Sequence, residues 1–166
     1  PLFCVNIEPE GNPVWNKSNE IIRKYKRYKK ILDSEGIPSG ILLQSTFGHG
    51  TNSTAPAPFE MMCRLDGGDD VNAYCPMDER MLDHLCEEIK TIAKAGPRVL
   101  MLDDDTVILM RPGYPCACPL HMAEFNKRCG TNYTRETLFN HLSAAGDEDD
   151  LARAFVTMQR DTLVHA

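Results

Sequence analysis

The order of strand-like and helix-like segments restricts the fold of this chain more than any other feature. Three apolar runs of strand length, LFCVNI, SGILLQ and RVLML, alternate with two segments whose apolar residues recur at helical spacing. These helical segments are residues 18–34 and the stretch MDERMLDHLCEEIKTIAKAGP. The alternation is typical of βαβ units, so we predict an α/β protein with a parallel sheet. Further helices are expected near residues 121–128, 134–142 and 150–163.

The third run, RVLML, is apolar throughout. Continuous apolar character is typical of a strand that helices cover on both faces of a parallel sheet. We therefore expect this strand to be buried on both faces.

Polar residues follow each predicted strand, at the end where parallel α/β folds collect their working residues. These residues are Glu8, the segment from Gln44 to His49, and the triplet Asp103, Asp104 and Asp105. Three adjacent carboxylates raise one another's pKa, and a partly desolvated member can hold a proton and act as a general acid. A solvated acidic loop or a site for a hard cation explains the triplet equally well.

Seven cysteines are present, and an odd number does not fit a complete set of intrachain disulfides. Cys4 lies in a strand-like run and Cys86 on the apolar side of a predicted helix, so we expect both to be small buried hydrophobic residues.

The remaining cysteines include a group with metal-ligand spacing. Cys116, Cys118 and His121 supply two thiolates and an imidazole within six residues, a set that suits tetrahedral zinc. Cys75 is the natural fourth ligand, with Cys63 and Cys129 as alternatives. A loop with incidental thiols, or a disulfide, is the competing interpretation.

Charge and hydropathy limit the partners. The formal net charge of −6 argues against binding to duplex nucleic acid, and no apolar run is long enough to cross a bilayer. The first predicted helix carries a basic face, which we interpret as solvated rather than as a site for an anionic partner. The chain starts at Pro1 with a strand-like run and no signal-peptide pattern, so we expect it to begin within a fold. We expect a cytoplasmic protein, although the N-terminus itself carries no localisation signal.

The stretch YCPMDERML, followed by a helix, an apolar strand ending in acids, and then CACPLHMAEF, resembles the zinc-containing β-galactosidase type of glycoside hydrolase and related glycosyl-hydrolase-like barrels. LLQSTFGHG and RPG are also similar to the latter. The resemblance covers about residues 40 to 126. It implies a (β/α)₈ barrel and a structural zinc ion with four ligands, of which the last is usually the third cysteine of a Cys-x-Cys-x-x-Cys cluster. The implied ligands here are Cys75, Cys116, Cys118 and His121.

The resemblance also implies roles for the strand-end residues. Asp105 takes the position of the acid/base glutamate and Asp104 that of a sugar-binding asparagine, while Asp103, Gln44, His49 and Glu8 line the same cleft and bind substrate. A retaining glycosidase needs a second carboxylate about 5 Å from the first, and no later strand is evident to supply it. We therefore expect residues 1–166 to be a single segment of a partial TIM (β/α)₈ barrel, with about three βα units and no hydrolytic activity alone.

The expected partners are a carbohydrate substrate and either the rest of the parent barrel or further copies of the chain. Two other functions fit the same residues. A non-catalytic barrel relative would use the acids only to bind sugar hydroxyls. A small zinc-stabilised α/β interaction module would use the basic helix as its partner surface.

Overall fold

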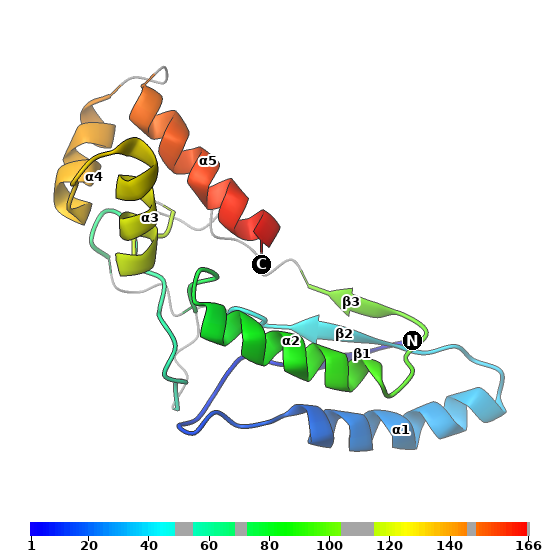
Figure 1. The fold of residues 1–166 in the computed structure, drawn as a ribbon. Coiled ribbons are helices and arrows are strands. Elements are labelled where there is room, and N and C mark those ends of the chain that lie inside the picture. Colours follow the sequence, from blue (N-terminus) through cyan, green and yellow to red (C-terminus); the bar gives the residue numbers. More distant parts are fainter. Residues whose placement is uncertain (49–54, 69–72, 104–114, 146–148, 166) are drawn as a thin grey trace. The chain divides into compact units, whose positions relative to one another are not determined.

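The computed structural model describes residues 1–48, 55–68, 73–103, 115–145 and 149–165. Its elements follow the predicted alternation (Figure 1). They are β1 (Leu2–Asn6), α1 (Ser18–Ser34), β2 (Gly40–Gln44), α2 (Glu79–Ala93), β3 (Leu100–Leu102), α3 (Pro119–Cys129), α4 (Arg135–Ala144) and α5 (Asp150–His165). The predicted helices and strands are therefore confirmed, with ends that shift by a few residues. The described residues form two compact units.

Unit 1 comprises residues 1–48, 55–58 and 80–103. Its three strands are parallel and lie in the order β1-β2-β3 (Figure 1). When parallel strands follow one another in sequence order, right-handed crossovers place the connecting helices on the same face of the sheet. The prediction of an α/β fold with a parallel sheet is confirmed, and three strands do not show a closed barrel.

One face of this sheet is covered. Ile41 and Leu43 of β2 are fully buried, and Phe3, which is paired with Ile41, packs edge-to-face on Tyr25 of α1 with ring centroids 5.4 Å apart. On α2, Met81 and Ile92 are also fully buried. The covered face of unit 1 is therefore an apolar core between the sheet and its helices.

The opposite face of the sheet is open among the described residues. Cys4 is exposed there, and Met101 of β3 is 47% exposed. The expectation that β3 is buried on both faces is wrong, because this strand pairs only with β2 in the described sheet and forms its edge. The expectation that Cys4 is buried is wrong for a different reason: side chains alternate along β1, and this alternation turns Cys4 away from α1.

The burial of α2 follows a single stripe. Met81, Leu85, Glu88 and Ile92 are its buried residues. Cys86 is exposed, which corrects the prediction that it is buried, because it lies well off this stripe. The Glu88 carboxylate is buried with the stripe and accepts the backbone N–H of Lys17 at 2.5 Å.

Unit 2 comprises residues 59–68, 73–79, 115–145 and 149–165. Its helices enclose an apolar core in which Phe125 of α3 packs edge-to-face on Phe155 of α5, with centroids 5.5 Å apart. Helix α4 begins with a capping box, in which Thr134 and Thr137 satisfy each other's backbone N–H groups. Within the described part of the chain, no helix has both the length and the apolar character needed to span a membrane.

Candidate metal centre

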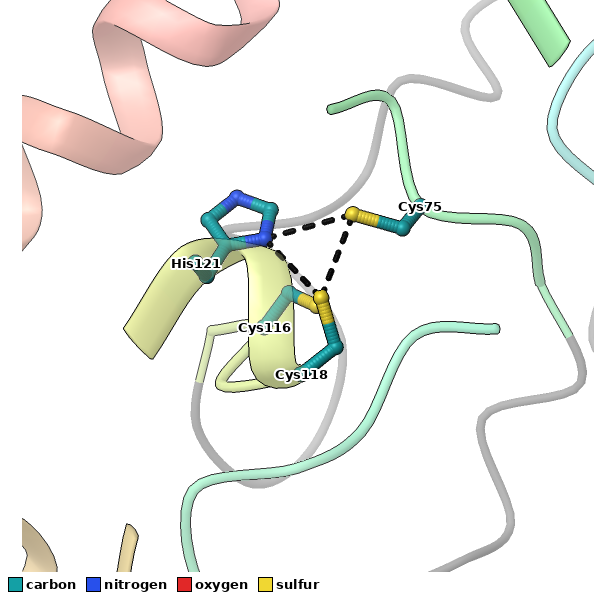
Figure 2. Close-up of side chains that lie close together, drawn as sticks. All are labelled: Cys75, Cys116, Cys118 and His121. Carbon is teal, nitrogen blue, oxygen red and sulfur yellow. Dashed lines mark hydrogen bonds between the residues drawn. The ribbon is translucent and has the colours of Figure 1, made fainter. Parts of the chain in front are cut away.

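Four side chains of unit 2 converge on one point in the structure (Figure 2). Their candidate ligand atoms all lie within 4.8 Å of one another, and all four residues are buried. We call them the Cys3His cluster: Cys75, Cys116, Cys118 and His121. The structure therefore brings together the four residues that the sequence predicted as metal ligands, and the cluster can hold a metal ion.

The spacing of the ligand atoms fits a tetrahedral ion. Sγ of Cys75 lies 3.3 Å from Nδ1 of His121 and 3.4 Å from Sγ of Cys118, and the last atom is 3.5 Å from Nδ1 of His121. A zinc ion with bonds of about 2.3 Å to sulfur and about 2.0 Å to nitrogen holds its ligand atoms about 3.5–3.8 Å apart. The three separations lie within a few tenths of an ångström of that range.

The start of α3 positions two of the ligands. Cys118 is the N-cap residue with an extended backbone, and Pro119 follows at the first helical position, where its fixed φ favours a helix start. His121 lies three residues after Cys118, and residues at this spacing share one side of a helical turn. The Cys-x-x-His spacing therefore directs a thiol and an imidazole toward the same point.

An extended segment, residues 60–64, connects the other ligands. Cys75 donates its backbone N–H to Glu60 at 2.7 Å, and Met62 donates to Ala73 at 2.7 Å. At the other end of the segment, Arg64 forms an antiparallel bridge with Cys116. Cys75 and Cys116 are distant in the sequence, and this segment holds both through backbone hydrogen bonds.

The turn after Cys75 adds a hydrogen bond to its sulfur. The backbone N–H of Met77 donates to Sγ of Cys75 at 3.4 Å, and that of Asp78 donates to the Cys75 carbonyl at 3.0 Å. An N–H directed at a sulfur favours the thiolate form, which is the form that binds metals, but the contacts of Cys75 with Cys116 and Cys118 and its burial outweigh this and raise its pKa.

The three thiols of the cluster differ in pKa. Hydrogen bonds with Cys116 and Cys75 hold the pKa of Cys118 well below its usual range. A hydrogen bond with Cys118 raises the pKa of Cys116 to about 12. Hydrogen bonds with Cys116 and Cys118, together with burial, raise the pKa of Cys75. The metal-free cluster thus favours one thiolate and two thiols, and a bound cation must displace the remaining protons.

Cys63 and Cys129 were the alternative fourth ligands. Cys63 packs against the buried residues around the cluster, whereas Cys129 packs against the apolar core of Phe125. Among the described residues, neither joins the group of atoms that can share a metal. Cys75 is therefore the fourth candidate ligand in this geometry.

The predicted strand-end residues lie in unit 1. Gln44 donates from Nε2 to the Asp103 carboxylate at 2.9 Å, so these two residues are adjacent. Glu8 is buried, and its carbonyl accepts Nζ of Lys17 at 2.6 Å. Asp104, Asp105 and His49 lie outside the described residues.

Sequence reasoning missed a third polar residue beside Gln44. Asn6 pairs with Gln44 in the register of β1 and β2, so Asn6, Gln44 and Asp103 form a polar row across the carboxyl ends of three strands. The Oδ1 atom of Asn6 accepts the backbone N–H of Glu8 at 2.8 Å. The signal was present in the sequence, since Asn6 is the polar residue near the end of the first apolar run, LFCVNI.

No protein-family model, curated protein or solved structure matches this chain.

Proposed function

We propose that this chain binds one structural zinc ion in the Cys3His cluster and forms part of a glycoside hydrolase-like barrel that acts on carbohydrate. The observation that carries the metal site is the convergence of four buried ligand atoms within 4.8 Å. Three sulfurs and one imidazole nitrogen are the donors that tetrahedral zinc prefers. Four protein ligands leave no open position for water, which favours a structural role over a catalytic one.

Metal content per chain tests the zinc site. We expect about one zinc ion per chain by elemental analysis after purification without added metal, and none in Cys116→Ser. Cys129→Ser is the matched control, because it removes a thiol of unit 2 that packs in the apolar core. A wild-type chain without metal, or a zinc content that Cys116→Ser leaves unchanged, would overturn the site.

Two features of unit 1 support the barrel and its carbohydrate ligand. Sequential parallel strands with helices on one face are the repeating arrangement of a (β/α)₈ barrel, whose sites lie at the carboxyl ends of the strands. The polar row of Asn6, Gln44 and Asp103 lies at those ends and offers amide and carboxylate groups to sugar hydroxyls. The resemblance of YCPMDERML and CACPLHMAEF to the zinc-containing β-galactosidase type supplies the substrate class.

Asp105→Ala in a parent protein that contains the whole proposed barrel tests catalysis separately from binding, because residues 1–166 alone are not expected to hydrolyse sugars. We expect loss of hydrolysis of aryl glycosides with retained sugar affinity, because the proposed role of Asp105 is that of the acid/base. Loss of affinity alone would favour a non-catalytic carbohydrate-binding barrel. A parent protein that shows neither hydrolysis nor sugar binding would leave the zinc-stabilised interaction module.

A further inference from the structure

Two buried polar atoms of unit 2 have no hydrogen-bond partner among the residues that the structure describes. They are Nε2 of His121 on α3 and Oε1 of Gln159 on α5, and both residues are fully buried. A buried polar group without a partner costs about 1–3 kcal/mol, so native proteins leave few of them. Each of these two atoms therefore needs an explanation.

The contacts of each side chain determine which of these atoms donates. Nδ1 of His121 faces the sulfurs of Cys75 and Cys118, so the proton of a metal-bound imidazole must be on Nε2 (Figure 2). Gln159 donates from Nε2 to the carbonyl of Cys116 at 2.7 Å, and because a carbonyl can only accept, the orientation of the amide is fixed. One orphan atom is therefore a donor and the other an acceptor.

Three contacts place Gln159 beside the Cys3His cluster. Its amide bonds to the backbone of Cys116, itself a member of the cluster. One turn further along α5, Leu163 packs against the buried cysteines. The preceding residue, Met158, shares an apolar core with Met122 of α3, the neighbour of His121. Contacts on both sides of Gln159 thus join it to the residues around the imidazole.

We propose that Gln159 is a positioning residue of the metal centre, whose Oε1 accepts the Nε2–H of His121 through one buried water molecule. This inference rests on the proposed zinc site. A metal-bound histidine usually donates its second ring N–H to a carbonyl or carboxylate, which fixes the tautomer and the ring orientation. The same amide holds the Cys116 backbone, so one side chain of α5 orients two of the four ligands.

Zinc affinity measures the contribution of Gln159. In competition with a chromogenic chelator, we expect Gln159→Leu to weaken zinc binding about 10–100-fold, the usual cost of losing an outer partner of a metal ligand. Thr157→Ala, at an exposed position on the same helix, is the control and should leave the affinity unchanged. A folded Gln159→Leu chain with wild-type affinity would overturn the proposal.

A double-mutant cycle separates the histidine contact from the Cys116 contact. His121→Cys keeps four zinc ligands but removes the ring N–H, so in this background Gln159→Leu should cost much less than it does beside His121. Equal losses in both backgrounds would overturn the pairing and leave Gln159 only its bond to Cys116. A wild-type chain that binds no zinc would instead defeat the proposed function, so the two failures are distinguishable.

The imidazole proton gives a readout that does not depend on affinity. In zinc-loaded chain with ¹⁵N-labelled histidine, we expect the proton of His121 on Nε2, protected from exchange with solvent. Gln159→Glu retains an acceptor oxygen and should keep that proton hydrogen-bonded, whereas Gln159→Leu should release it. A proton on Nδ1, or an Nε2–H signal that neither substitution changes, would contradict the assignment.

Discussion

Unit 1 and unit 2 bury different kinds of side chain. The buried residues of β2 and α2 in unit 1 are mostly aliphatic, and the helices cover one face of a sheet whose other face is open among the described residues. Unit 2 instead buries three cysteine thiols and an imidazole beside an apolar helix core. Regular hydrogen bonding between parallel strands connects the sheet of unit 1. In unit 2, isolated β-bridges between short extended segments connect the region around the four candidate ligands.

This difference indicates two sources of stability. In unit 1, the parallel ladder and the apolar face stabilise each other, and neither requires a ligand. In the described part of unit 2, the segments that carry Cys75 and Cys116 make few backbone hydrogen bonds outside residues 60–64, and a metal ion that joins four side chains can supply additional free energy. We therefore expect unit 2, and not unit 1, to depend on zinc.

Removal of zinc is the largest expected effect. Structural zinc contributes roughly 10–16 kcal/mol in small zinc-binding peptides, so a chelator should unfold unit 2. Amide hydrogen exchange at Met62, Cys75 and Ala117 should become fast, while Ile41 and Asp103, whose amides bond to neighbouring backbone in unit 1, stay protected. Equal loss of protection in both units would show that they fold as one body, and no loss in either would show that the ion is dispensable.

The contrast between the units also explains what the sequence revealed. Helical periodicity placed Ser18–Ser34 correctly because its apolar stripe and its terminal glycine, Gly36, act locally. Three of the four candidate ligands, Cys116, Cys118 and His121, were identifiable because their types and spacing suit one ion, whereas Cys75 was chosen over Cys63 and Cys129. Sequence predicts such features well, since each depends on residues close together in the chain or on the chemistry of a small set.

The errors came from features that depend on the tertiary environment. The apolar run of β3 does not reveal that the strand is an edge, so Met101 was expected to be buried and is 47% exposed. Gln159 occupies the apolar stripe of α5 with Phe155 and Met158, and a polar residue at such a position was the signal that could have marked it. Its partner, the Cys116 carbonyl, comes from a segment 43 residues away and has no sequence signature.

The second largest expected effect is the loss of stability when a side chain on the covered face of the sheet is truncated, compared with one on the open face. Leu43→Ala removes a fully buried side chain and should destabilise unit 1 by about 2–5 kcal/mol in urea unfolding, without loss of zinc. Met101→Ala, on the open face, should cost about 0.5 kcal/mol or less. If both cost the same, the open face is covered in solution, by further copies of the chain or by the rest of a barrel.

The smallest expected effect tests whether zinc binding and the folding of unit 2 are one process. Thr134 accepts the N–H of Thr137 at 3.2 Å and caps α4, so Thr134→Ala should cost about 1 kcal/mol, whereas Thr134→Ser retains the hydroxyl and should cost little. If metal-free unit 2 is unfolded, zinc binding includes the free energy of folding. The loss of about 1 kcal/mol in Thr134→Ala must then also lower the apparent zinc affinity, by about fivefold.

We expect this decrease, because unit 2 is small and part of its buried interior consists of the metal ligands themselves. Chelator competition on Thr134→Ala and Thr134→Ser measures it directly. An unchanged affinity in a measurably destabilised Thr134→Ala chain would mean that α3, α4 and α5 stay packed without the ion. Zinc would then clamp only the ligand segments, and the difference between the two units would be confined to residues 60–64 and the backbone they hold.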